Sequence, residues 1–87
     1  MATVWIPPLL HDLTGGNTRL SVPGATVREV IAELDRQYPG IGVRLCEDGR
    51  IRPGMSVVVD SMVSRAGLRH RLSETSEVHF VPALSGG

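Results

Sequence analysis

The sequence has 87 residues, a length that suits one domain and leaves no room for two. Apolar residues make up 41% of the chain, which is enough for a globular core and argues against disorder. Nine basic residues balance nine acidic ones, so the basic excess that recruits nucleic-acid phosphates is absent. We therefore expect no nucleic-acid partner.

Cysteine usage and the N-terminus indicate a cytoplasmic protein without a membrane partner. Cys46 is the only cysteine, so neither an internal disulfide nor a thiolate metal cluster can form. The N-terminus lacks the basic stretch and apolar run of a signal peptide, and no segment approaches the roughly 18 apolar residues that cross a bilayer. All nine basic residues are arginine. The absence of lysine either removes any ε-amine that an activated carboxyl group could acylate, or reflects genomic base composition.

The N-terminal part of the chain predicts a β-hairpin. Residues 3–10 open with β-branched and aromatic residues typical of a strand. Pro7 and Pro8 cannot donate ladder hydrogen bonds, so the strand should become irregular or run along an edge there. Residues 14–17 (TGGN) accept the positive φ that a hairpin turn requires. Residues 18–22 would form the returning strand.

An amphipathic helix follows. Thr26 can cap it, and Glu29 three residues later completes a capping-box pattern. The apolar residues at spacing i, i+3, i+4, i+7 and i+11 share one side of the helix; they are Val27, Val30, Ile31, Leu34 and Tyr38. The Pro-Gly pair at residues 39–40 ends the helix.

The rest of the chain predicts short strands around an irregular segment. Residues 43–46 read as a short strand, and residues 55–59 as a well-buried one. Residues 60–77 are polar and irregular, with a short 3₁₀ turn at residues 67–68. Residues 77–81 form the last strand, in which alternate residues face opposite sides of the sheet.

This order of elements describes a two-layer α+β domain in which one main helix covers one face of a mixed sheet. It is the β-grasp arrangement. We expect the domain to comprise residues 1–82 and residues 83–87 to form a flexible C-terminal tail. The tail ends in Gly86 and Gly87, which lack a Cβ, so it should be narrow and mobile, with an open terminal carboxylate. Such a tail suits a carboxylate that another enzyme modifies; the alternative is a frayed end or a cloning scar.

Three segments carry a family resemblance: residues 26–30 (TVREV) opening the helix, residues 38–41 (YPGI) closing it, and residues 78–87 (VHFVPALSGG) at the end. They are similar to the ubiquitin-like sulfur carriers, which include the small subunit of molybdopterin synthase, the thiamine-pathway carrier and the cysteine-synthase carrier. Residues 6–10 and 14–16 resemble the cysteine-synthase type most closely. Asp60-Ser61 stands where the family usually has an Asn-containing turn, which leaves the geometry of that turn open.

The resemblance implies a function for the tail. An E1-like adenylyltransferase/sulfurtransferase would adenylate the Gly87 carboxylate with ATP, and sulfur would replace AMP to give a thiocarboxylate. Gly86, which has no side chain, would let Gly87 enter a narrow active site. A sulfur-accepting synthase of a cysteine-type or thiosugar-type pathway would be the second partner. The chain would be a carrier and cosubstrate, not an enzyme, and would bind no permanent cofactor, because the ATP belongs to the activating enzyme. Alternatives are a molybdopterin synthase small subunit, a ubiquitin-like protein modifier, or an interaction domain with an inert tail.

Trp5 indicates where a partner would dock. If its two sequence neighbours face the helix, Trp5 faces the open side of the sheet. The first and last strands of a β-grasp fold are central neighbours, which would put His79 and Val81 beside it. Aromatic residues often anchor interfaces. The expected partner-binding residues are Trp5, His79, Val81, Ala83, Leu84 and Ser85. Alternatively, Trp5 packs under residues 60–77 or under the tail.

Other candidate sites carry weaker signals. Serine, histidine and aspartate are present, but no serine lies in a Gly-x-Ser-x-Gly elbow. The three histidines lack paired-ligand spacing, so no metal site is expected. Cys46 suits a small buried hydrophobic position better than a nucleophile. One basic loop is either a solvated loop or a contact for an acidic partner or phosphate; its residues are Arg65, Arg69, His70 and Arg71.

Overall fold

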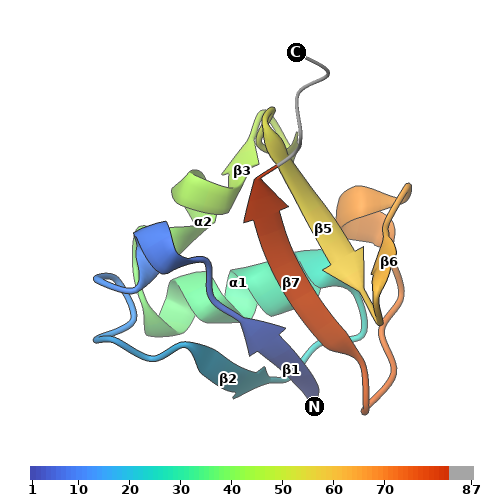
Figure 1. The fold of residues 1–87 in the computed structure, drawn as a ribbon, viewed down its shortest axis with the longest axis horizontal. Helices are drawn as coiled ribbons and strands as arrows, with labels where there is room; N and C mark the ends of the chain where they lie inside the picture. The colour runs from blue at the N-terminus through green and yellow to red at the C-terminus, as the bar shows by residue number, and fades with distance from the viewer. Residues whose placement is uncertain (83–87) are drawn as a thin grey trace.

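The structure is a computed structural model, and it describes residues 1–82 (Figure 1). Its elements, in chain order, are β1 (Ala2–Trp5), η1 (Pro8–Leu10), β2 (Arg19–Val22), α1 (Val27–Gln37), α2 (Ile41–Leu45), β3 (Cys46–Glu47), β4 (Arg50–Ile51), β5 (Met55–Val59), β6 (Met62–Val63), η2 (Gly67–Arg69) and β7 (Glu77–Pro82).

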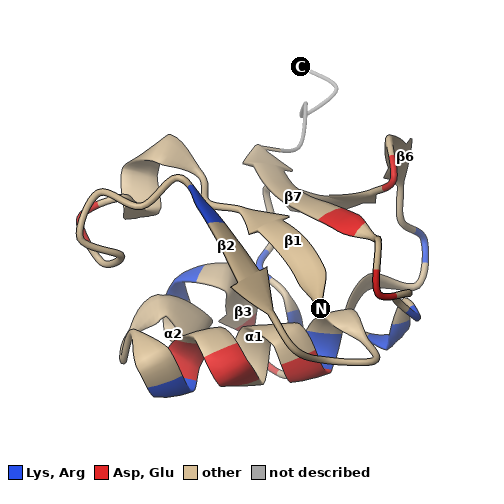
Figure 2. Ribbon diagram, turned by 90° about the horizontal axis from the view of Figure 1, so that it is seen from below, with Lys and Arg blue, Asp and Glu red and all other residues tan. Residues whose placement is uncertain are grey.

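Five of the strands form one mixed sheet in the order β2-β1-β7-β5-β6. The first and last strands, β1 and β7, pair in parallel, while every other neighbouring pair is antiparallel. Helix α1 crosses one face of this sheet, and the other face is open (Figures 1 and 2). Strands β3 and β4 form a separate two-stranded ribbon. The α+β, β-grasp architecture predicted from the sequence is thus confirmed.

The core lies between the sheet and α1. Alternate residues of the central strands point into it, as the period of a strand requires; these are Val4, Val57, Val59, Val78 and Phe80, all buried. Ile6, the first residue after β1, is buried as well. The helix contributes Val27, Val30, Ile31 and Leu34, also buried. The apolar spacing of the helix therefore predicted its inward face correctly. Tyr38 is the exception, because it is the C-cap residue and lies partly buried against the edge of the core.

The start of α1 is capped by side chains. Thr26 Oγ1 accepts a hydrogen bond from the backbone N–H of Glu29 at 3.2 Å, as predicted. Glu29 Oε1 reaches back to accept from the N–H of Ala25 at 3.1 Å, one residue before the partner of a standard capping box. One of the helix's unpaired N-terminal donors is thereby satisfied, and the bond to Ala25 fixes the chain just before the helix.

Residues 43–46 are not a strand, contrary to the prediction. Most of them belong to α2, and only Cys46 enters β3. The cause is the preceding turn: Gly40 takes φ 104°, and Asp35 Oδ1 accepts hydrogen bonds from the N–H groups of Gly40 and Gly42 at 3.2 and 2.9 Å. The Asp35 side chain of α1 thus organises the short helix α2. The first and last residues of α2, Ile41 and Leu45, are buried.

The first strand is also shorter than predicted, because the two prolines end the ladder. β1 stops at Trp5, and the chain turns into η1 with Pro8 at its first position. The long connection to β2 includes the glycines expected in positive φ, Gly15 at 64° and Gly16 at 87°. The turn residues of the predicted hairpin are therefore right, but the turn lies in a wider loop.

The Asp60-Ser61 turn has a defined geometry. Both residues lie in the left-handed region, with φ of 50° and 72°, and connect β5 to β6 as a two-residue hairpin loop. Asp60 also exchanges hydrogen bonds with the start of β7: its N–H donates to Glu77 O, and its Oδ1 accepts from Glu77 N, each at 2.9 Å. The carboxylate therefore holds the outer hairpin to the central strand.

Within residues 1–82, neither α-helix combines the length and the hydrophobicity needed to cross a membrane.

Leu34→Ala should lower the free energy of unfolding by about 2–5 kcal/mol, because Leu34 is fully buried at the centre of α1. Chemical denaturation followed by circular dichroism measures the loss. Arg28→Ala on the exposed side of the same helix is the control, and should stay within about 0.5 kcal/mol of the native chain. Equal effects of the two substitutions would contradict the helix orientation.

Candidate functional site

The open face of the sheet carries a row of five side chains, one from each strand. In register, Arg19 of β2 lies beside Trp5 of β1, Trp5 beside His79 of β7, His79 beside Val58 of β5, and Val58 beside Val63 of β6. The strands at this face carry few charged residues, whereas charges are frequent on the outer side of α1 (Figure 2). We call these five residues the open-face row.

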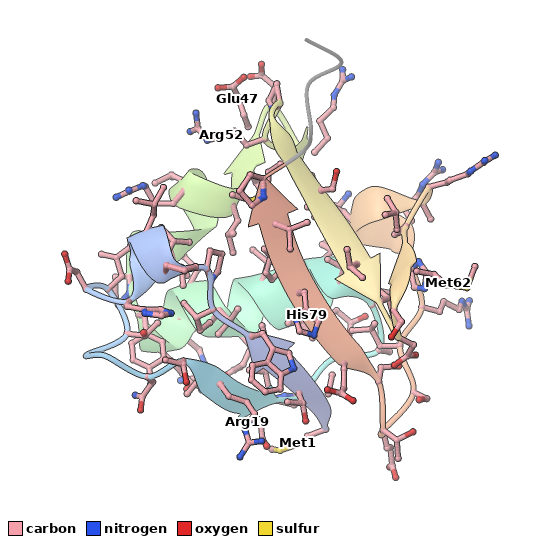
Figure 3. The ribbon with its side chains drawn as sticks, viewed as in Figure 1. Met1, Arg19, Glu47, Arg52, Met62 and His79 are labelled. Carbon is pink, nitrogen blue, oxygen red and sulfur yellow. The ribbon has the colours of Figure 1, made fainter. Side chains whose placement is uncertain are left out.

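Trp5, the second residue of this row, contacts the side chains on both sides of it. Its ring stacks on the His79 imidazole with centroids 5.3 Å apart and planes inclined by 10°. The Arg19 guanidinium lies 5.4 Å from the centroid of the indole, and Trp5 Nε1–H donates to Glu77 Oε1 at 3.2 Å. Arg19 and His79 are labelled in Figure 3, which looks onto this face. Trp5 is half-buried in a fixed orientation, and an aromatic ring so held presents contact area at low entropic cost.

The predicted neighbours of Trp5 are only partly adjacent to it. His79 is its direct partner, but Val81 lies two residues further along β7, opposite Ser56 of β5. Val81 is nevertheless half-buried on the same side of β7. The placement of Trp5 on the open face is therefore confirmed, with Val81 between the row and the end of the strand.

The other predicted site residues lie outside the described residues; they are Ala83, Leu84, Ser85, Gly86 and Gly87. The structure does describe the point from which they extend, Pro82, at the end of β7. At about 3.3 Å per residue, the His79–Trp5 stack is about 10 Å from Pro82. Five extended residues span at most about 18 Å. An enzyme that acts on Gly87 must therefore approach the same end of the sheet.

A groove beside Pro82 was not anticipated from the sequence. It has a volume of about 520 Å³ and is lined by Pro7, Pro8, Leu9, Leu10, Arg44, Arg52, Met55, Phe80 and Pro82. We call it the tail-root groove. Leu9 is 85% exposed, the most exposed of the large apolar side chains in residues 1–82. The Pro-Pro-Leu-Leu run is evident in the sequence, but the other residues that line the groove come from three distant segments of the chain.

The surroundings of Cys46, His11 and His70 indicate structural roles for these side chains. Cys46 is half-buried, and burial raises the pKa of its thiol, opposed in part by the nearby Arg28 charge. Little thiolate is therefore present near neutral pH. His11 Nε2 lies 2.8 Å from Ile6 O, and His70 Nδ1 lies 2.7 Å from Ser64 Oγ. Among residues 1–82, no three potential ligands from histidine, cysteine and acidic residues gather at one point.

The basic loop divides into two parts. Arg65 and Arg69 line a hollow of about 510 Å³ together with Arg28 and Arg50. His70 instead faces Ser64, and the backbone of Arg71 forms an isolated bridge with Thr26. The loop thus also fixes the start of α1.

Comparison with known proteins identifies the family. The sequence model of the ThiS family matches residues 4–87. The sulfur carrier protein CysO of Mycobacterium tuberculosis is 32% identical over 90 residues, which cover 98% of this chain and 97% of CysO. The small archaeal modifier protein 3 of Haloferax volcanii is 32% identical over 65 residues, covering 72% of this chain and 71% of that protein. The BexX/CysO complex of Amycolatopsis orientalis contains a chain that matches with a TM-score of 0.90 at 30% identity, covering 100% of both chains.

The fold and the described end of the sheet thus define a ubiquitin-like protein. The chain belongs to the ThiS family. This confirms the resemblance to the ubiquitin-like sulfur carriers, and the relatives are small carrier or modifier proteins by name, in keeping with the expectation that the chain is not an enzyme.

Trp5 fluorescence should report an accessible indole, because the ring lies on the open face. As Trp5 is the only tryptophan, iodide should quench the emission of the folded chain to a substantial fraction of the quenching seen in denaturant. The stacked imidazole and Glu77 leave the indole partly shielded, so the two should not be equal. Complete protection from iodide in the folded chain would contradict the assignment of Trp5 to the open face.

Proposed function

We propose that this protein carries sulfur as a thiocarboxylate on Gly87. An E1-like enzyme adenylates the carboxylate with ATP, a sulfur donor displaces AMP, and the thiocarboxylate delivers sulfur to a synthase. The observation that carries the proposal is the match of the ThiS family to residues 4–87, which includes Gly86 and Gly87. The protein acts as a cosubstrate: it binds no resident cofactor, and the ATP is held by the activating enzyme.

The chemistry of the tail supports this role. Adenylation converts a poor leaving group into a good one, so sulfide can attack the acyl carbon, form the carbon–sulfur bond of the thiocarboxylate and expel AMP. A glycine carboxylate is open on both sides, and a Gly-Gly end fits a slot too narrow for any side chain. Because the activating enzyme supplies nucleotide and acid–base groups, the carrier needs only to bring the carboxylate to it. The absence of lysine from the chain also leaves no ε-amine to react with the adenylate.

The open-face row supports a docking role. The stacked Trp5 and His79 lie about 10 Å from Pro82. With Val81, which lies between this stack and the end of β7, they form a weakly charged surface. A partner that covers this surface would hold the tail towards its own active site. Rigid aromatic side chains at the centre of a contact commonly contribute most of its binding energy. We assign Trp5 and His79 to recognition of the activating enzyme.

The relatives favour a cysteine-type or secondary-metabolite pathway for the sulfur. The M. tuberculosis relative is named CysO, and an A. orientalis CysO has been solved in complex with BexX. By analogy, this chain would bind a sulfur-accepting synthase through its tail, in the cytoplasm.

A second candidate function is protein modification, which the relationship to an archaeal modifier protein favours. In this case the activated Gly87 would form isopeptide bonds with lysines of other proteins. Incubating a tagged chain with cell extract and ATP separates the two functions. Covalent adducts on other proteins indicate a modifier, whereas a free thiocarboxylate without adducts indicates a carrier.

Deletion of Gly87 should abolish adenylation, because the reacting carboxylate moves back by one residue, next to Ser85. The melting temperature should stay nearly unchanged, since a chain terminus contributes few buried contacts. ATP–pyrophosphate exchange with the activating enzyme measures the first effect, and calorimetry the second. Adenylation at the native rate, or a melting temperature several degrees lower, would contradict this account of the tail.

Trp5→Ala should weaken binding to the activating enzyme by about 2 kcal/mol or more if Trp5 anchors the contact. The loss of stability should be smaller, because Trp5 lies outside the buried core. Titration calorimetry measures the affinity. Met62→Ala is the matched control, since Met62 is 72% exposed and lies on the edge strand outside the open-face row. Equal affinities for the native chain and the Trp5 variant would show that Trp5 on the open face does not contribute to binding of the activating enzyme.

A further inference from the structure

The tail-root groove lies on the opposite side of β7 from the open-face row. Successive residues of a strand point to opposite faces, and in β7 the buried side chains are Val78 and Phe80, whereas His79 and Val81 face the open side. Pro82 continues the sequence of inward positions and lines the groove together with Phe80. The chain therefore leaves the domain between two distinct surfaces, one on each side of Pro82.

The groove displays an apolar side chain that the fold holds in place. Leu9 is 85% exposed, while the adjacent Leu10 is 3% exposed and anchors the same turn in the core. The turn is closed by a hydrogen bond from Leu10 N to Pro7 O at 2.8 Å, and by His11 Nε2 at 2.8 Å from Ile6 O. Two prolines further restrict the backbone. Leu9 is thus presented to solvent by a rigid segment, which reduces the entropy lost when a partner covers it.

Positive charge borders the groove. Arg52 donates to Glu47 Oε1 at 3.2 Å and to Val43 O at 2.7 Å, so its guanidinium is fixed, while its buried Nε has no hydrogen-bond partner within residues 1–82. Arg44 is exposed and makes no ion pair within the same part of the chain. Figure 3 shows Arg52 and Glu47 at the end of the molecule where β7 ends. Arg44 is therefore available to an acidic group that approaches the groove.

The length of the tail determines what can cover this groove. Gly87 is the fifth residue after Pro82, and five residues span at most about 18 Å even when fully extended. An enzyme that encloses Gly87 in a deep active site uses much of that length inside its own slot. The rim of the slot must then lie against the surface around Pro82, which includes Leu9 and the groove.

We propose that the tail-root groove is a second docking site for the activating enzyme, and that it receives an apolar side chain next to a carboxylate from the rim of that enzyme's tail slot. The apolar side chain packs against Leu9, Met55 and Phe80, and the carboxylate pairs with Arg44. The enzyme then contacts the domain on both sides of Pro82, at the open-face row and at the groove. These two contacts set the direction in which Gly87 enters the enzyme's tail slot. This inference rests on the function proposed above.

Leu9→Ser tests the apolar part of the site. With the activating enzyme and ATP, the KM for the carrier in ATP–pyrophosphate exchange should rise at least tenfold, while kcat stays within twofold, because the tail itself is intact. Val43→Ser is the matched control: Val43 is 65% exposed but does not line the groove, so its KM should not change. Leu9→Met, which keeps a large apolar side chain, should restore a KM close to that of the native chain.

Arg44→Glu tests the charged part. Its KM should rise severalfold, and the difference from the native chain should shrink at high salt, because an exposed ion pair is screened. Arg50→Glu is the control, with the same change of charge at an exposed residue outside the groove. Equal effects of both substitutions would show that only the net charge matters, and would overturn the assignment of Arg44.

The outcomes separate this proposal from the one on which it rests. If the native chain supports no ATP–pyrophosphate exchange, the proposed function fails and the groove proposal fails with it. If the native chain is active and the KM of Leu9→Ser stays within twofold of the native value, the groove proposal alone fails. A lower kcat at unchanged KM would also overturn it, because Leu9 would then act on the tail and not on docking. Thermal melts of all variants check that each one is folded.

Discussion

The parallel pairing of β1 with β7 is the contact on which the rest of the structure depends. It joins the two ends of the chain at the centre of the sheet, with Thr3 opposite Glu77, Val4 opposite Val78 and Trp5 opposite His79. A parallel pair needs a long crossover connection, and α1 lies within the segment that separates the two strands. The same pairing places Trp5 on His79 and fixes β7 as far as Pro82, the last residue that the structure describes. A central strand is hard to displace, so Pro82 is held at a rigid point.

The register of this pair separates the core from the binding surface. A slip by one residue would turn Val78 and Phe80 outward and bury His79. Val4 and Val78 are completely buried in the observed register, and a slip would lose that burial. Because Pro82 follows in the same alternation, the register also decides which surfaces flank the tail. The weakly charged open face lies on one side, and the groove with its arginines lies on the other. The domain thus fixes Pro82 between two different surfaces.

Local patterns in the sequence predicted the elements that depend on local physics. The spacing of Val27, Val30, Ile31 and Leu34 predicted α1, and the alternation around Val78 predicted β7 and, with Trp5, the open face. The short helix α2 was missed because Asp35, a side chain of another element, organises its first turn. The groove could not be predicted, because its lining comes from η1, α2, β5 and β7 and from Arg52, which meet only in the folded chain. The function proposed for Gly87 rests on the family relationship and not on the geometry of residues 1–82.

The mass of the intact chain tests the central claim most directly. The purified protein is incubated with an E1-like enzyme, ATP and sulfide, and then analysed by mass spectrometry with fragmentation. The account predicts an increase equal to the exchange of one oxygen atom for one sulfur atom, located on Gly87 and absent when ATP is omitted. An unchanged mass under conditions in which the enzyme activates a known carrier would contradict the account. So would an increase of the same size that also appears when ATP is omitted, since the sulfur would then be bound without adenylation of Gly87.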